Sequence, residues 1–233
     1  MADEKRVKVA IVDHGLGNLF SVKQACEHAG MQASITSSQQ AILRADAVIL
    51  PGVGAFGNAM DALKRLDLIS PLKEVAASQK PLIGICLGMQ LLMTESSEFG
   101  RHRGLGIIEG SAVRFENPVG PSGKLKVPQI GWDRIFRPKG VEVSSNCDNN
   151  RDPWLGSPLE GLSDGEFMYF VHSFYAKPEV DNLILSTSRY GNVEFCSSLK
   201  YRNIFAFQFH PERSGPQGLK IYSSLRSVIQ SAT

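Results

Sequence analysis

Apolar residues in the first half of the chain fall in short runs that alternate with segments of helical periodicity. Runs that favour buried strands lie at 8–13, 33–36, 46–52 and 81–86. Residues 18–29 carry the helical spacing between the first two runs, and the last two runs are each followed by helix-like periodicity. Alternating strands and helices predict a parallel sheet with helices on both faces.

The second half is dominated by strand-like segments. They lie at 111–115, 127–136, 165–177, 183–190, 194–201 and 204–210, which favours antiparallel or mixed pairing. Residues 137–163 are rich in Pro, Gly, Ser, Asn and Asp and predict a long surface loop, and a last helix is expected at about 215–230. We therefore expect an α/β fold with a parallel central sheet and additional antiparallel strands, forming one domain over residues 1–233.

Composition narrows the class of protein. The formal charge of +2 comes from well-mixed acidic and basic residues, so neither nucleic acid nor a membrane surface is an expected partner. No signal-peptide core and no apolar run of membrane-spanning length is present, which predicts a soluble, cytoplasmic protein. The four cysteines, Cys26, Cys86, Cys147 and Cys196, form no C-x-x-C pair, so neither a zinc site nor a disulfide framework is indicated. We expect no metal and no other cofactor.

Cys86 lies in "GICLG", where a strand-like run gives way to a helix-like one. A lone cysteine is most often a small buried hydrophobe. The spacing, however, is that of the nucleophile elbow G-x-S-x-G, in which a sharp strand-to-helix turn leaves no room for side chains at the flanking positions, here Gly84 and Gly88. A thiol at a helix N-terminus is favoured in its reactive thiolate form.

His210 and Glu212 could supply the base and the group that orients it. Both follow the apolar run "IFAFQF", with Pro211 between them. In an extended segment, residues two apart point to the same side, which would place a carboxylate beside the imidazole. Such a strand-end histidine is more often an ordinary residue, and only its combination with the elbow favours Cys-His-Glu chemistry.

Two glycine-rich turns follow parallel strands at the same edge of the predicted sheet, at 13–18 and 50–57. The second could supply backbone donors for an oxyanion, or it could be a plain strand-to-helix turn. It contains no lysine and no G-x-x-x-x-G-K-[ST] pattern, so a phosphate-binding loop is disfavoured.

The segments "GICLGMQLL", "PGVGAFG", "VPQIGWD", "YFVHSFY" and "FQFHPERSG" together resemble the class I (triad-type) glutamine amidotransferases. Within them, the chain is most similar to the HisH family of glutaminase subunits of imidazole glycerol phosphate synthase, and the resemblance runs from about residue 7 to residue 230. It implies a flavodoxin-like fold and an enzyme that hydrolyses L-glutamine to glutamate and ammonia. It also implies a heterodimer with a HisF-like (β/α)8 barrel cyclase, which uses the ammonia to make imidazole glycerol phosphate and AICAR in histidine biosynthesis.

The resemblance assigns roles residue by residue. Cys86 would be the nucleophile, His210 the general base and acid, and Glu212 the orienting carboxylate. The remaining assignments are backbone N–H groups of the oxyanion hole at Gly52, Val53 and Leu87; contacts to substrate glutamine at Gly54, Gln90, Glu98, His172, Ser173 and Phe174; and the partner interface at Asn18, Trp132 and Arg213. The alternative for Trp132 is that it lies in the core instead of at the interface. The alternative for His172 is that it is a strand residue packed under the site and does not contact the substrate.

The chain departs from the family at Gln129 and Asp133, where His and Asn are usual, and at Arg213, where Lys is usual. These departures concern docking rather than glutamine chemistry. Three other interpretations stay open on sequence alone: a HisH paralogue that supplies ammonia to another synthase, such as one for sugar amidination; a non-catalytic regulator; and a cysteine peptidase with a related elbow.

Overall fold

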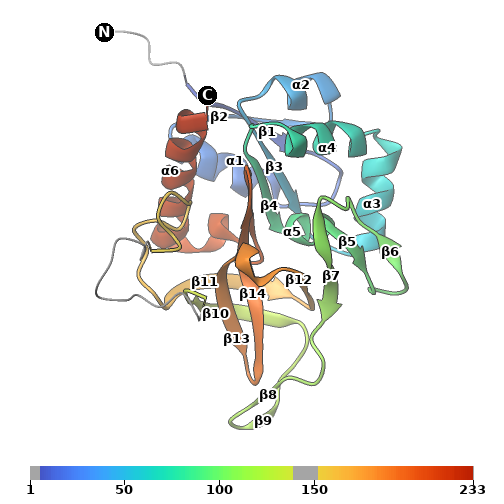
Figure 1. Ribbon diagram of the computed structural model, residues 1–233, viewed down its shortest axis with the longest axis vertical. Coiled ribbons are helices and arrows are strands. Elements are labelled where there is room, and N and C mark those ends of the chain that lie inside the picture. The colour runs from blue at the N-terminus through green and yellow to red at the C-terminus, as the bar shows by residue number, and fades with distance from the viewer. Residues whose placement is uncertain (1–5, 139–151, 233) are drawn as a thin grey trace.

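In the computed structural model, which describes residues 6–138 and 152–232, the central feature is a seven-stranded sheet (Figure 1). From one edge to the other its strands are β13 (Ile184–Tyr190), β14 (Val193–Tyr201), β15 (Ile204–Phe207), β4 (Leu82–Cys86), β3 (Ala47–Gly52), β1 (Lys8–Val12) and β2 (Gln32–Thr36). The five strands from β15 to β2 run parallel, whereas β14 pairs antiparallel with both of its neighbours, β15 and β13. The predicted α/β class with added antiparallel strands is confirmed.

Alternate residues of β1 point to opposite faces of this sheet, and each face is covered by helices. Val9 and Ile11 pack in the apolar cluster that includes residues of α1 (Leu19–His28) and α6 (Gly215–Ala232). Ala10 and Val12 pack in the other cluster, which contains residues of α2 (Gln39–Arg44), α3 (Phe56–Arg65), α4 (Ile69–Ala77) and α5 (Leu87–Leu91). Because both of their faces are buried, the inner parallel strands β1, β3, β4 and β15 are mostly apolar runs in the sequence, whereas the edge strand β2 is partly exposed and more polar.

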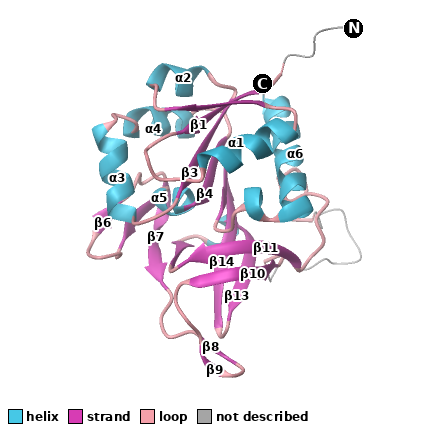
Figure 2. Ribbon diagram, turned by 180° about the vertical axis from the view of Figure 1, so that it is seen from behind, coloured by secondary structure: helices cyan, strands magenta, loops and turns pink. Residues whose placement is uncertain are grey.

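Smaller sheets extend from the carboxyl ends of the parallel strands. One contains β12 (Phe174–Pro178), β7 (Ile108–Arg114), β5 (Met93–Ser96) and β6 (His102–Arg103), and another pairs β10 (Gln129–Ile135) with β11 (Glu166–His172). The β10–β11 ribbon lies beyond α1 and α6, and β8 (Val119–Gly120) and β9 (Gly123–Lys124) form a projecting hairpin (Figure 2). Two 3-10 turns, η1 (Asp181–Leu183) and η2 (Pro211–Arg213), complete the elements.

Two strand predictions and one helix prediction require correction. The segment 165–177 is not one strand, because the chain leaves β11 at Ser173 and continues as β12 in a different sheet. The helix after β4 has only five residues and is followed by the unexpected strand β5. Strand β15 ends at Phe207, so the expected extension to 210 is wrong. In each case the apolar pattern continues through the change of element, since the residues on both sides are buried.

The expected surface loop at 137–163 falls in two parts. Residues 139–151 lie outside the described residues. The following segment runs along the surface but inserts apolar side chains into the core: Trp154 and Leu159 are fully buried, whereas Leu155 is exposed. The Trp154 Nε1–H donates to the Leu185 carbonyl at 2.7 Å, and the Arg137 guanidinium lies 4.1 Å from the Trp154 ring centroid. The polar composition around Trp154 concealed this apolar anchor.

Over the described part of the chain, no helix is both long enough and apolar enough to cross a bilayer. Within the same residues, no group of three or more His, Cys, Asp or Glu side chains has a metal-binding arrangement.

The burial of Trp154 leads to a stability prediction. Trp154→Ala should lower the free energy of unfolding by about 3–5 kcal/mol, because it leaves a large cavity and an unpaired Leu185 carbonyl. Leu155→Ala, at the next and largely exposed position, should change it by no more than about 0.5 kcal/mol. Urea denaturation of both variants measures the two effects, and equal small changes would contradict a core role for this segment.

Candidate active site

Cys86 occupies a strained turn between β4 and α5. Its backbone has φ 54° and ψ −111°, a conformation that residues with a Cβ atom rarely adopt. A Cβ atom at Gly88 would overlap the Leu50 carbonyl, and one at Gly84 would lie 3.0 Å from the backbone of Met89. The helix can therefore approach the strands only with glycine at both positions, which is the steric condition expected for an elbow.

The Cys86 thiol is 5% exposed and faces groups from several elements. Its Sγ atom lies 3.9 Å from the Val171 carbonyl oxygen of β11 and 3.8 Å from the Gln208 amide nitrogen, which follows β15. With five residues, α5 provides little more than one helical turn. The polar groups that contact the sulfur come from β11 and from the residue that follows β15.

His210 and Glu212 form a buried pair. Nδ1 of His210 lies 2.8 Å from Oε1 of Glu212, and the two side chains are only 4% and 1% exposed. The carboxylate can only accept, so the proton is on Nδ1. The contact does not use the extended geometry expected from the sequence, because Pro211–Arg213 forms the 3-10 turn η2. This turn brings Glu212 back to the imidazole that precedes it.

Electrostatics favour a charged imidazole at this position. Burial by itself lowers the pKa of His210, but the Cys86 sulfur and the Glu212 carboxylate offset it and raise this pKa to about 10. Among the described residues no partner of His210 Nε2 meets full hydrogen-bond geometry, but the Cys86 sulfur is near enough to interact with the imidazole and to raise its pKa. At neutral pH the arrangement favours an imidazolium beside the sulfur.

The backbone of His210 is anchored to β11. Its N–H donates to the Tyr169 carbonyl at 2.9 Å, and its carbonyl accepts from the Ser214 hydroxyl at 2.7 Å. The same Ser214 oxygen accepts from the Tyr169 N–H at 3.0 Å. Sequence analysis missed Ser214, although its place directly after "HPER" was a possible signal. The three contacts hold η2 and β11 in one position.

The glycine-rich turn after β3 lies beside the elbow. Gly52 pairs in register with Cys86, and a Cβ atom at Gly52 would lie 3.0 Å from that of Leu87. Gly54 has φ +93°, and Val53 between the two glycines is 39% exposed. Sequence analysis missed the buried His14, which ties the first strand-to-helix turn to this one: its Nε2–H donates to the Pro51 carbonyl at 2.8 Å.

The residues expected to contact a substrate divide into two groups. Gln90, His172 and Phe174 are joined, because the Phe174 carbonyl accepts from Gln90 Nε2 at 2.7 Å and from His172 Nδ1 at 2.9 Å. Burial lowers the pKa of His172 to about 3, so this ring is neutral. Glu98 instead accepts from the Phe56 N–H at 2.6 Å, and the partly exposed Ser173 accepts from Phe115 through its carbonyl.

Two residues of the expected interface flank Tyr169. The Trp132 ring packs edge-on at 6.0 Å, and the Arg213 guanidinium lies 4.8 Å from the same ring centroid. Trp132 is 55% exposed, so the alternative of a core position is wrong. Asn18 is the partly exposed N-cap residue of α1.

Gln129 and Asp133, the other two positions at which a departure from the family is expected, contact each other. Gln129 Nε2 donates to Asp133 Oδ2 at 3.0 Å. Gln129 is buried at the start of β10, whereas Asp133 is partly exposed. Burial is the main cause that raises the pKa of Asp133. Gln129 and Asp133 thus form one local pair.

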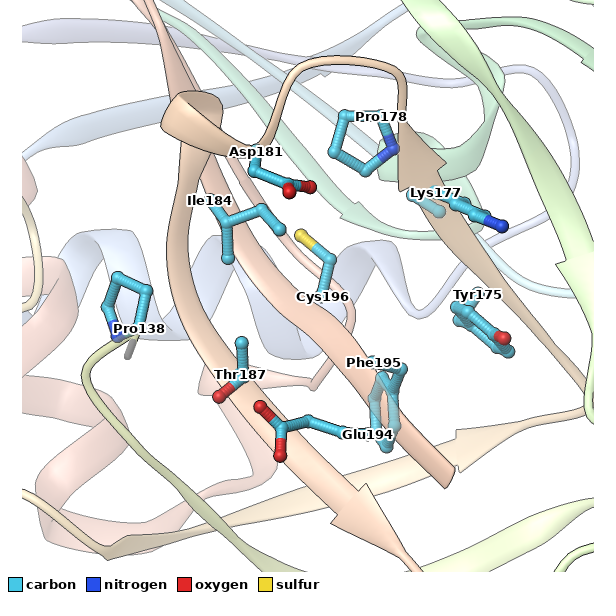
Figure 3. Close-up of a pocket in the computed structure, with 11 residues that line it drawn as sticks. Pro138, Tyr175, Lys177, Pro178, Asp181, Ile184, Thr187, Glu194, Phe195 and Cys196 are labelled. Carbon is cyan, nitrogen blue, oxygen red and sulfur yellow. The ribbon is translucent and has the colours of Figure 1, made fainter. Parts of the chain in front are cut away.

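A separate surface cavity of about 460 Å³ lies over β12, β13 and β14 (Figure 3). Its lining includes Tyr175, Lys177, Thr187 and Cys196, but not Cys86 or the His210–Glu212 pair. The Cys196 thiol donates to the Ser198 carbonyl at 3.3 Å, and burial raises its pKa well above the ordinary value. This second thiol therefore lacks the environment of a nucleophile.

The chain matches the family model for class-I glutamine amidotransferases over residues 10–225. It is 39% identical over 228 residues to the imidazole glycerol phosphate synthase subunit HisH of Aquifex aeolicus, covering 97% of this chain and 100% of that protein. It is also 39% identical over 221 residues to subunit HisH 1 of Legionella pneumophila, covering 94% of this chain and 99% of the relative.

Solved structures share the fold at lower sequence identity. A crystal structure of a glutamine amidotransferase superposes with a TM-score of 0.66 at 16% identity, covering 96% of this chain and 98% of the other. PurLQS from Thermotoga maritima superposes with a TM-score of 0.64 at 18% identity, covering 94% of this chain and 97% of the other.

The buried, neutral His172 leads to a prediction about acid stability. Its pKa is lower in the folded chain than the ordinary 6.5, so the unfolded chain binds the extra proton and stability falls as pH decreases from about 6.5 towards 3. The unsubstituted protein should lose free energy of unfolding between about pH 7 and pH 5, and His172→Gln should make this loss smaller by about 2 kcal/mol. His28→Gln, at an exposed position, is the control. Denaturation curves at both pH values decide, and an unchanged slope in His172→Gln would contradict the assignment.

Proposed function

This chain belongs to the class I glutamine amidotransferase family, and we propose that it is the glutaminase subunit of an imidazole glycerol phosphate synthase. In this role it hydrolyses the side-chain amide of L-glutamine. The observation that carries the proposal is the meeting of Cys86, on its strained elbow, with the buried His210–Glu212 pair. A thiol, a base and an orienting carboxylate are the three groups that cysteine-based acyl transfer requires.

The reaction begins with attack of the Cys86 thiolate on the glutamine amide carbon. The carbonyl electron pair moves to oxygen, and a tetrahedral intermediate forms. His210, protonated beside the sulfur, gives its proton to the amide nitrogen, and the C–N bond breaks to release ammonia. Water, deprotonated by His210, then attacks the γ-glutamyl thioester, and glutamate leaves while the sulfur departs as thiolate. Glu212 accepts from Nδ1 throughout and stabilises the imidazolium.

Backbone donors would stabilise the oxyanion of both tetrahedral intermediates. We assign this role to the Leu87 N–H, directly after the nucleophile, and to an N–H of the Gly52–Val53 turn. The turn is suitable because Gly52 lies in register with Cys86 and because glycines flank Val53. His14 supports the turn through the Pro51 carbonyl. Donors fixed before the reaction need no reorganisation when the charge develops.

We assign Gln90 and the His172–Phe174 segment to the binding of glutamine, with Gly54 and Glu98 as further contacts. Both N–H bonds of the Gln90 amide are directed to protein acceptors, the Phe174 carbonyl and the Gln208 side chain. Its carbonyl oxygen is therefore the group available to a substrate donor.

The proposed partner is a (β/α)8 barrel cyclase, which would receive ammonia directly and use it to form imidazole glycerol phosphate and AICAR. The names of the HisH relatives support a subunit role. We assign docking to the surface of Trp132, Tyr169 and Arg213, with Asn18 as a further contact. This surface is partly apolar, and its central residue Tyr169 lies on β11, the strand whose Val171 carbonyl borders the Cys86 sulfur.

Glutamate release with and without the barrel subunit and its ribonucleotide tests the activity. Cys86→Ala should reduce release at least a thousandfold, because no other group can form the thioester. Cys196→Ala is the matched control and should stay within a few-fold of the unsubstituted protein, since that thiol is remote from His210 and hydrogen-bonded elsewhere. A glutamine analogue with a diazoketone should label Cys86 alone. Activity surviving in Cys86→Ala, or labelling at another cysteine, would refute the mechanism.

Trp132→Ala should weaken binding of the barrel subunit about 30-fold or more, since truncating a good aromatic anchor costs roughly 2–4 kcal/mol. The melting temperature should change little, because the ring is 55% exposed. Phe99→Ala is the control, as Phe99 is 91% exposed on the β5–β6 connection. Calorimetric titration and melting curves measure both quantities. Unchanged affinity in Trp132→Ala would mean that docking uses another surface.

A further inference from the structure

Gln208 is a buried polar residue for which the proposed mechanism has no role. It lies between the end of β15 and His210 and is 0% exposed. A buried side-chain amide is costly unless its donors and acceptor are satisfied. The partners of Gln208 therefore indicate what this residue does.

A chain of hydrogen bonds determines which end of the Gln208 amide faces which neighbour. The chain begins at the Phe174 carbonyl, which can only accept, so the group of Gln90 that contacts it at 2.7 Å is Nε2. The same Gln90 nitrogen lies 3.1 Å from the Gln208 side chain and donates to its oxygen. The Gln208 nitrogen is therefore directed the other way, towards Cys86 Sγ at 3.8 Å. The amide cannot be reversed without placing two donors against each other.

An N–H group directed at sulfur distinguishes the two protonation states of the thiol. It stabilises the thiolate, which accepts strongly, more than the neutral thiol, and the effect is enhanced in a site closed to water. Among the described residues, Cys86 Sγ is the one hydrogen-bond partner found for the Gln208 side-chain nitrogen. The Gln208 side-chain oxygen accepts from Gln90, so the amide is held in this orientation.

We propose that Gln208 is a further catalytic residue: its amide N–H, oriented by Gln90, stabilises the Cys86 thiolate before attack and again when the sulfur leaves. The inference rests on the proposed glutaminase function. Gln208 would act from the β15 side of the sulfur, in addition to His210. Because Gln90 is assigned to glutamine binding, the same chain connects the substrate pocket to the nucleophile.

The test is the rate at which iodoacetamide alkylates Cys86, followed by peptide mass over a range of pH. Gln208→Leu removes the amide, and Gln208→Glu keeps its size and polarity but replaces the donor with an acceptor. Both should move the pH of half-maximal alkylation rate upward, by about half to one unit for Leu and further for Glu, where a carboxylate opposes the thiolate. In the glutaminase assay, kcat should fall about fivefold to tenfold, with a smaller change in KM, since Gln208 contacts the sulfur.

Ser186→Ala is the matched control, because it also removes a fully buried polar group, one hydrogen-bonded to Ser197 and Ser198 away from Cys86. It should lower thermal stability without moving the alkylation profile. If both Gln208 variants fold and keep the original profile, or if only Gln208→Leu shifts it, Gln208 is structural and the proposal is overturned. Alkylation does not require turnover. If the unsubstituted protein does not hydrolyse glutamine but the Gln208 variants still shift the alkylation profile, the proposed function is wrong, whereas Gln208 does stabilise the Cys86 thiolate.

Discussion

The strained turn at Cys86 is the constraint on which the rest of the site depends. Cys86 has φ 54° although it carries a Cβ atom. It holds this angle because α5 packs so closely on β3 and β4 that a Cβ atom at Gly88 would overlap the Leu50 carbonyl. Such strain persists only where the surroundings determine the backbone fully. The parallel core, covered by helices on both faces, supplies that rigidity, and the thiol is thereby held at the carboxyl edge of the sheet, where other elements can reach it.

Strand β11 is the element that joins the parts of the site. Its Val171 carbonyl lies near the Cys86 sulfur, and its Tyr169 backbone pairs with His210. At Ser173 the chain changes sheets, so that the Phe174 carbonyl can accept from both His172 and Gln90. Strand β11 and the break that follows it therefore contact the His210 backbone, the Cys86 thiol and the Gln90 side chain, although these residues are distant in sequence.

The same strand also forms part of the surface. The ring of Tyr169 lies between Trp132 and Arg213, while its backbone holds His210. A protein that bound this surface would contact β11, the strand to which the backbone of the proposed base His210 is hydrogen-bonded. Coupling between docking and catalysis would then need no long pathway, because one residue contacts both. The hydrogen-bonded pair of Gln129 and Asp133 lies in the adjacent β10, the strand that also carries Trp132 of this surface.

The sequence by itself determined the alternating α/β core, the glycine-flanked Cys86 and the proximity in chain of His210 and Glu212, because these depend on local periodicity, steric need and short separations. It was misleading where tertiary packing overrode composition, as at the buried Trp154, and where a continuous apolar pattern concealed the change of sheet at Ser173. The 3-10 turn that joins His210 to Glu212 replaced the extended geometry expected. Only the tertiary structure could bring Gln208, Gln90 and Phe174 together beside the sulfur. A buried amide is satisfied by whichever partners the fold provides, and no local pattern in the sequence specifies them.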